Sequence, residues 1–370
     1  MALLAIDSFS SYNQNTIDEN GGKFNNWRIE SDPPTEVSIS GEYGRNSSPG
    51  LKLITNSYFI GSRGYVSAYL GANYETVIMG AAVKVSSTST STSSEAHYNN
   101  DRVIFSILDG SDAQACLCLT PSMRLRVRQR GASGLEAGRS SFYLHEDVYY
   151  YIEFKCLINR SSGTFTVRVD GVERLTGSGN TQITANAHAN GARLGAPSDV
   201  AQSIAGRHIY YDDFYVAAVV AGTSHNDFVG DIMVEGRTPI REGPSVQWTP
   251  SSGTLHYSLI DDTVPNTTDY VRAAASGEID LFAFSSSSVS AGAIAAIVPN
   301  IYARKTAAGV VQIAPIMNRH GTTTVASDEN YPTQEYQYHY SNVWDTRISD
   351  DAAWPIDFSD DTNFGVKRTS

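Results

Sequence analysis

The sequence has little cysteine, few charged residues and no long apolar run. Its 370 residues include 3 cysteines, and 18% of the residues are charged. Cys116 and Cys118 lie two positions apart and Cys156 is remote from both, so the spacing of a zinc site is missing and buried thiols are predicted. No run approaches the ~18 apolar residues of a membrane span. The sequence predicts neither membrane insertion nor a disulfide framework. It predicts synthesis and folding in a cytoplasm.

Positive charge is the scarcer sign: 27 Lys and Arg residues stand against 39 Asp and Glu residues, which gives a formal net charge of -12. The acidic residues are spread over both halves of the chain, and such a field disfavours nucleic acid as a partner. One basic cluster alternates with other residues so that its members share one strand face: Arg124, Arg126, Arg128 and Arg130. We expect that face to be solvated or paired with carboxylates rather than to bind nucleic acid.

The abundant residues and patterns are those of an all-β protein. Tyr occurs 21 times, and short apolar or alternating runs recur between turn residues, whereas helical periodicity is scarce. The predicted strands of the first half are 51–54, 76–85, 103–108, 115–119, 123–129, 149–158, 164–169 and 208–216. Those of the second half are 245–249, 255–259, 279–284, 293–302, 310–317 and 335–340.

Turn and loop signals complete this pattern. Asp170-Gly171 predicts a tight primed turn inside a three-stranded meander over 149–175. The polar run Ser86–Ser94 predicts a mobile loop. The aromatic C-terminal stretch predicts an irregular segment packed on a second core.

A small-residue hinge divides the chain. Residues 217–224 are small and include Gly222, which favours a short connection between two β domains. We predict one domain over 1–222 and a second over 223–370.

Three stretches of the first half carry a family resemblance: Ile6–Tyr12, the meander 151–171 and Tyr211–Tyr215. They resemble the concanavalin-like lectin and laminin-G-like jelly-roll superfamily of phage and prophage virion proteins. The second half is similar to a module that follows such domains in tailed-phage structural proteins. Its landmarks are Asn226–Asp231, Gln247–Pro250, Asp269–Val271, Asp280–Phe282, Trp354 and Asn363–Lys367.

The resemblance implies a concanavalin-like jelly-roll sandwich followed by a smaller β-sandwich-like domain. It also implies a non-enzymatic virion structural protein, made in the host cytoplasm, in a tail or appendage with potential for host adhesion. Expected partners are other virion proteins, sister copies in a homo-oligomer and a host-surface glycan. Two alternatives stay open: a capsid decoration protein that cements the shell, and a glycan-degrading depolymerase.

Two groups of residues are candidate sites. Tyr336, Tyr338 and Tyr340, with Trp344, could form an aromatic platform for a sugar or a protein partner, and a buried cross-strand ladder is the alternative. Asp212 and Asp213 could supply oxygen ligands to Ca²⁺. Because consecutive strand residues point to opposite faces, only one of these two carboxylates is expected at any one site.

One carboxylate pair is a candidate for catalysis. Glu278 and Asp280 alternate on a predicted strand, as do the nucleophile and helper Asp of concanavalin-like glycoside hydrolases, but Phe282 or Ala283 stands where the acid is needed. The sequence therefore predicts no catalytic residue.

Overall fold

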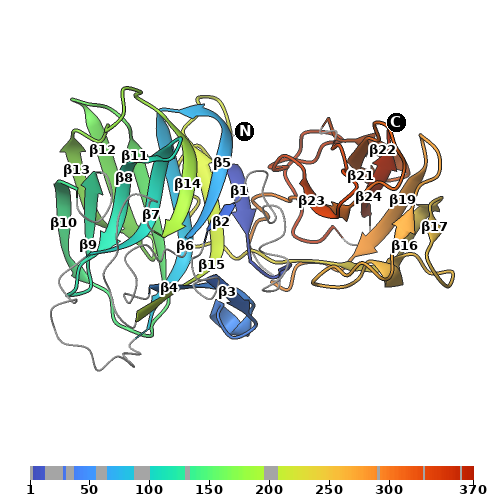
Figure 1. The fold of residues 1–370 in the computed structure, drawn as a ribbon, viewed down its shortest axis with the longest axis horizontal. Coiled ribbons are helices and arrows are strands. Elements are labelled where there is room, and N and C mark those ends of the chain that lie inside the picture. The colour runs from blue at the N-terminus through green and yellow to red at the C-terminus, as the bar shows by residue number, and fades with distance from the viewer. Residues whose placement is uncertain are drawn as a thin grey trace. The chain divides into compact units, whose positions relative to one another are not determined.

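The structure is a computed structural model, and it describes residues 3–12, 28–30, 37–55, 65–86, 101–129, 134–195, 207–289, 292–327, 330–358 and 361–370. The chain forms two compact units, with Val234 as the last residue of unit 1 and Glu235 as the first of the main part of unit 2. Figure 1 shows that both units are built from strands. In the described residues no helix is long and apolar enough to cross a membrane.

Unit 1 is a sandwich of two antiparallel sheets, here called sheet A and sheet B. Sheet A contains β1 (Leu3–Asp7), β3 (Val37–Ser40), β4 (Gly50–Thr55), β6 (Thr76–Val85), β11 (Tyr150–Leu157), β12 (Gly163–Val169), β13 (Val172–Gly179) and β15 (Arg207–Ala218). Sheet B contains β2 (Arg28–Glu30), β5 (Tyr65–Tyr74), β7 (Arg102–Asp109), β8 (Asp112–Leu119), β9 (Arg124–Gln129), β10 (Glu136–Tyr143) and β14 (Ala189–Gly195).

The centre of sheet A explains how the two sheets meet. Strand β15 pairs with β6 on one side and with β4 and β1 on the other. Tyr211 of β15 is fully buried, and its hydroxyl donates to the carbonyl oxygen of Ile104 in β7, 2.9 Å away. Since β7 belongs to sheet B, Tyr211 faces the interior of the sandwich. Its neighbours Tyr210 and Asp212 therefore belong to the outer face of sheet A.

Several sequence-based predictions of unit 1 are confirmed. Strand β6 covers 76–85 as predicted, and β11, β12 and β13 form the predicted meander. Asp170 and Gly171 have φ angles of 50° and 75°, as a primed turn requires. All three cysteines are buried and free. Apart from Ser86, the loop predicted over Ser86–Ser94 lies outside the described residues.

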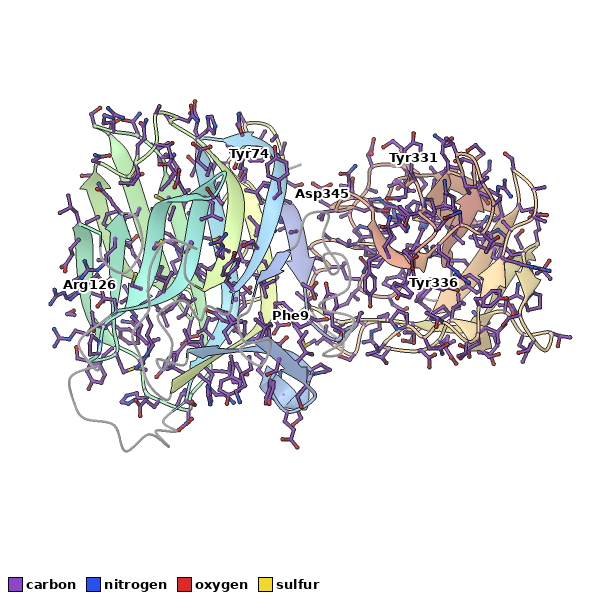
Figure 2. All side chains as sticks on the ribbon, in the orientation of Figure 1. Phe9, Tyr74, Arg126, Tyr331, Tyr336 and Asp345 are labelled. Atoms are coloured by element: carbon purple, nitrogen blue, oxygen red, sulfur yellow. The ribbon has the colours of Figure 1, made fainter. Side chains whose placement is uncertain are left out.

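The arginine strand is paired with carboxylates. On β9, Arg126 and Arg128 both donate to Asp101, at 2.9 and 2.5 Å, and Arg126 also contacts Glu136 at 3.0 Å. Arg126 is labelled in Figure 2. Arg130 lies outside the described part of the chain. The pairing leaves this face little free positive charge for nucleic acid.

Unit 2 is smaller and has one main sheet. It contains β16 (Pro239–Val246), β19 (Ile279–Phe284), β21 (Ile313–Arg319), β22 (Thr322–Val325) and β24 (Thr362–Arg368). Two pairs accompany it: β17 (Thr249–Pro250) with β18 (Val271–Arg272), and β20 (Asn300–Ala303) with β23 (Gln337–Tyr340). Short 3-10 turns lie at Arg45–Ser47 in unit 1 and Tyr257–Leu259 in unit 2.

Two expectations for unit 2 are wrong, and a third, the irregular C-terminal segment packed on the core, holds except at its end. The stretch 255–259 ends in a 3-10 turn instead of forming a strand. Of 293–302 only the end belongs to β20, while Ile294 and Ile297 make isolated bridges to Trp354 and Trp344. The C-terminal aromatic stretch ends in β24, which lies between β19 and β21 in the sheet. Its position there depends on Gly365, because a Cβ at that position would lie 1.9 Å from the carbonyl oxygen of Asp280.

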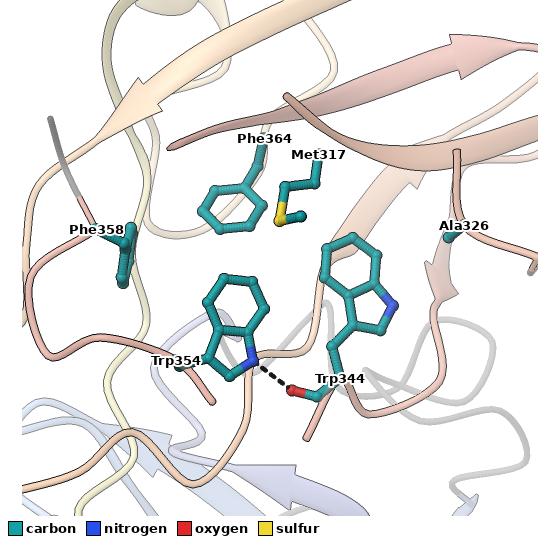
Figure 3. Close-up of a cluster of buried hydrophobic side chains, with 6 residues drawn as sticks. All are labelled: Met317, Ala326, Trp344, Trp354, Phe358 and Phe364. Carbon is teal, nitrogen blue, oxygen red and sulfur yellow. Dashed lines mark hydrogen bonds between the residues drawn. The ribbon is translucent and has the colours of Figure 1, made fainter. Parts of the chain in front are cut away.

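An aromatic cluster forms the core of unit 2 (Figure 3). The members drawn there are Met317, Ala326, Trp344, Trp354, Phe358 and Phe364. The indole N–H of Trp354 donates to the carbonyl oxygen of Trp344 at 2.8 Å. The large rings compensate for the short strands, because each buries a large apolar area.

Candidate functional site

A row of alternating tyrosine and lysine crosses the outer face of sheet A. Tyr210 of β15 is directly opposite Lys52 of β4 and Lys84 of β6 in the strand register. Residues that face each other across antiparallel strands share one face of a sheet, so the three side chains lie side by side. All three are partly exposed.

Two more tyrosines complete this group. Lys84 Nζ lies 4.6 Å from the Tyr210 ring centroid and 4.7 Å from that of Tyr149. Lys52 Nζ lies 5.8 Å from the Tyr210 ring and 5.1 Å from that of Tyr43. The rings of Tyr43 and Tyr210 meet edge to face at 5.4 Å, and the Tyr149 hydroxyl donates to the Tyr43 carbonyl oxygen. We call these five residues the tyrosine–lysine patch.

The charged groups of the patch itself are two ammonium groups, and the carboxylates of Asp147, Asp212 and Asp213 lie close enough to act on its tyrosines. Neither Lys52 nor Lys84 makes an ion pair in the described part of the chain, although the whole chain carries -12. Burial raises the pKa of Tyr149 and of Tyr210, so both hydroxyl groups stay protonated and neutral. Burial and the charge of Lys52 lower the pKa of the adjacent His208 to about 4, so this imidazole is neutral near pH 7. The patch thus presents two ammonium groups among neutral polar rings.

The predicted calcium ligands lie beside the patch and hold an arginine. Arg45 Nε donates to Asp213 at 2.5 Å, and the Arg45 backbone N–H donates to Asp212 at 3.0 Å. Ser48 donates to Asp212 at 2.6 Å. Both carboxylates thus meet at one place, and the expectation that they point to opposite faces is wrong. The reason is a bulge: the β15 register shifts after Asp212, and Asp213 has a φ of 50°.

The Arg45 guanidinium pairs with Asp213, while Asp212 accepts from the Arg45 backbone N–H and from Ser48. The residues that the structure describes contain no group of three or more His, Cys, Asp or Glu able to hold a metal ion. Calcium binding at Asp212 and Asp213 stays a prediction of the sequence. The structure gives these residues a different role, which is to fix Arg45.

A short strap then lies on the same face of sheet A. It consists of residues 227–234, and its backbone is held by side chains of the sheet. Buried Glu153 accepts from the Gly230 N–H at 2.8 Å and from the Tyr215 hydroxyl at 2.5 Å. The Val234 N–H donates to Asp213 at 2.6 Å. Arg168 lies 4.1 Å from the ring centroid of Phe228. The stretch Asn226–Asp231, expected to open the second domain, therefore belongs to unit 1.

The predicted aromatic platform of unit 2 is divided. Tyr336, labelled in Figure 2, stacks on Tyr302 with centroids 5.3 Å apart, and Tyr338 contacts the same ring at 4.8 Å. Tyr338 is buried. Trp344 is 4% exposed within the aromatic core and is thus no part of a surface platform. The side chain of Tyr340 lies outside the described residues. The arrangement is closer to the cross-strand ladder than to an open platform.

The carboxylate pair of unit 2 has structural partners. Asp280 is fully buried, contacts His256 Nδ1 at 2.6 Å and accepts from the N–H groups of Gln247 and Trp248 at 2.7 and 2.8 Å. Glu278 accepts from Ala274 and Ala275 N–H at 2.7 and 3.1 Å. These contacts hold the loops around β19 in place.

Comparisons with known proteins find likeness in structure alone. No protein-family model and no curated protein matches the sequence. An endo-β-1,4-glucuronan lyase from the fungus Trichoderma reesei is 13% identical, covering 54% of this chain and 94% of the lyase, with a TM-score of 0.39. An alginate lyase from a Chlorella virus is 11% identical, covering 57% and 100%, with a TM-score of 0.38. A domain of a GH43 arabinanase from Geobacillus stearothermophilus is 14% identical, covering 58% and 94%, with a TM-score of 0.35.

These neighbours contradict the sequence-based prediction that the chain is not an enzyme, and that prediction is wrong as stated. The likeness itself transfers no reaction, substrate or catalytic residue to this chain.

Sequence reasoning missed the tyrosine–lysine patch because its five members come from five separate segments. Lys52 and Lys84 each stand alone in an apolar run, and Tyr43 lies in a turn. The available signal was a lysine on the polar face of each of two predicted strands. That signal becomes a site only when the strand order places β4, β15 and β6 next to one another.

Proposed function

We propose that this chain binds carbohydrate on the outer face of sheet A, with the tyrosine–lysine patch as the contact surface. The observation that carries the proposal is the position of Tyr210, which is flanked by two lysines across three adjacent strands. Tyrosine offers an apolar ring for the C–H face of a sugar and a hydroxyl group for its polar edge. Ammonium groups add donors for sugar oxygens.

The patch is held rigid, which supports binding by a preformed surface. The three tyrosines of the patch are each two residues from Arg45 or from a residue that contacts it: Tyr43 precedes Arg45, Tyr149 precedes Tyr151, and Tyr210 precedes Asp212. Tyr151 donates to the Asp213 carbonyl oxygen at 3.0 Å, and Arg45 lies 5.4 Å from its ring centroid. A surface fixed in this way loses little conformational entropy when a ligand binds.

The test measures binding of the full chain to a glycan array and then titrates the best ligand by calorimetry. Tyr210→Ala should weaken affinity about tenfold, which corresponds to about 1.4 kcal/mol, while Tyr336→Ala in unit 2 should leave it unchanged. If only Tyr336→Ala weakens binding, the contact surface is the unit 2 aromatic group. A blank array with folded protein would refute carbohydrate binding.

Cleavage of the bound glycan is the second candidate, and the observation that favours it is the pKa of Asp212. Burial and the adjacent Asp213 charge raise this pKa to about 7. General acid catalysis requires a carboxyl group that is still partly protonated near neutral pH and that reaches the substrate. New reducing ends that appear with wild type and are lost in Asp212→Asn, with binding retained, would support cleavage.

A further inference from the structure

We propose that the ligand of the tyrosine–lysine patch is a glycan bearing carboxylate groups, with Lys52 and Lys84 each receiving one carboxylate. This inference rests on the proposed function and names the chemical class of the ligand. It can fail while carbohydrate binding itself stands.

The two lysines of the patch have no carboxylate partner among the described residues. Both ammonium groups lie over tyrosine rings. A ring face attracts the positive charge but accepts few of the three ammonium N–H groups. The remaining donors are free to bond a ligand, because both lysines are partly exposed. A carboxylate would fill them with charge-assisted hydrogen bonds.

The contrast with other basic residues on unit 1 strengthens this point. Lys155 on the same sheet pairs with Asp227 at 3.0 Å, and Arg126 pairs with Asp101 on sheet B. In a chain with a net charge of -12, carboxylates are plentiful, yet the patch has none on its lysines. Two unpaired ammonium groups on one face concentrate positive potential against the overall negative field.

The two lysines are spaced for a ligand with two separate negative charges. Lys52 and Lys84 lie on strands separated by β15, so their backbones are about 10 Å apart, twice the usual spacing of adjacent strands. A span of that order suits carboxylates on two sugar residues that are separated by a third. Tyr210 lies between the lysines, with both ammonium groups within 5.8 Å of its ring centroid, and its hydroxyl group is then close to the middle sugar.

Glycans come in charged and neutralised forms, and this allows a matched test. Hyaluronan, polygalacturonate and alginate are each titrated against the full chain beside their methyl-esterified forms, which keep the backbone and lose the charge. We expect at least one acid form to bind about tenfold more tightly than its ester. Raising sodium chloride from about 0.05 M to about 0.5 M should weaken the acid form, because screening shortens the reach of charge.

The variants assign the effect to the patch. Lys52→Gln and Lys84→Gln should each lower affinity for the acid form by about threefold to tenfold and leave the ester form unchanged. Lys305→Gln removes a lysine from unit 2 and should change neither. Melting temperatures of all variants establish that they are folded.

Four results would contradict the carboxylate inference, and one of them would also contradict carbohydrate binding. Equal binding of acid and ester forms, unaffected by the lysine variants, would overturn the carboxylate inference and leave carbohydrate binding intact. Dextran sulfate binding without any carboxylated polymer would also overturn it, since sulfate is then the recognised group. Equal binding of single-stranded DNA would overturn it as general attraction to polyanions. No binding of any glycan would overturn the proposed function as well.

Discussion

Gly80 is a position where one methyl group decides the packing of sheet A. A Cβ there would lie 2.1 Å from Cε1 of Tyr215, whose ring covers this strand and whose hydroxyl bonds Glu153. Gly80→Ala should therefore lower the unfolding free energy by about 1–3 kcal/mol, since Tyr215 is buried and has no room to move. Urea denaturation checks this. Gly41→Ala is the control, because no atom lies within 4 Å of its Cβ.

The raised pKa of Asp212 makes the stability of the fold depend on pH. Its pKa is raised from 3.8 to about 7, so between these values the folded chain binds more protons than the unfolded chain. Stability should therefore fall as pH rises from about 4 to about 7. Urea midpoints at several pH values check the slope. Asp212→Asn should flatten it, and an unchanged slope would show that another group titrates.

Among the structural elements, the strap of residues 227–234 depends on Glu153 for its attachment to sheet A. Its carboxylate accepts from Gly230 N–H and from Tyr215, and no other acceptor replaces it in the described contacts. Glu153→Ala should speed amide hydrogen exchange over 227–234 and lower stability by about 1–3 kcal/mol, because buried donors lose their partner. Asp231→Asn is the control: Asp231 is half exposed, so its ion pair with Arg45 contributes little. Equal exchange in both variants would contradict this role.

At the scale of the whole molecule the strap sets the extent of unit 1. The predicted domain 1–222 ends before the strap, whereas the compact unit runs to Val234. A protein of residues 1–234 should unfold at higher urea concentration than one of residues 1–222. The strap makes several hydrogen bonds to sheet A, each worth roughly 1 kcal/mol. Equal stability of the two proteins would place the boundary at the hinge after all.

The virion setting stays a prediction of the sequence resemblance, and it concerns the whole molecule. Immunogold electron microscopy of particles from the producing system should label tails or appendages. Label on the capsid lattice would favour the decoration alternative instead. Absence of the chain from purified particles would remove the virion assignment, although glycan recognition by unit 1 would be unaffected.

The sequence by itself determined the all-β class, the meander with its Asp170-Gly171 turn and the buried cysteines, because strand alternation, turn chemistry and thiol spacing are local properties. Sequence-based predictions fail where tertiary contacts override the local pattern. β24 pairs with β19 because Gly365 allows that strand to approach closely. Trp344 is buried because the core of unit 2 is filled by large rings.

Only the tertiary structure decided the candidate site. The order β4–β15–β6 joins Lys52, Tyr210 and Lys84, which are far apart in sequence, and the bulge at Asp213 turns two adjacent carboxylates onto one arginine. The physical reason is that a sequence shows which face of a strand a residue occupies, whereas strand order and bulges are settled by packing of the whole sandwich.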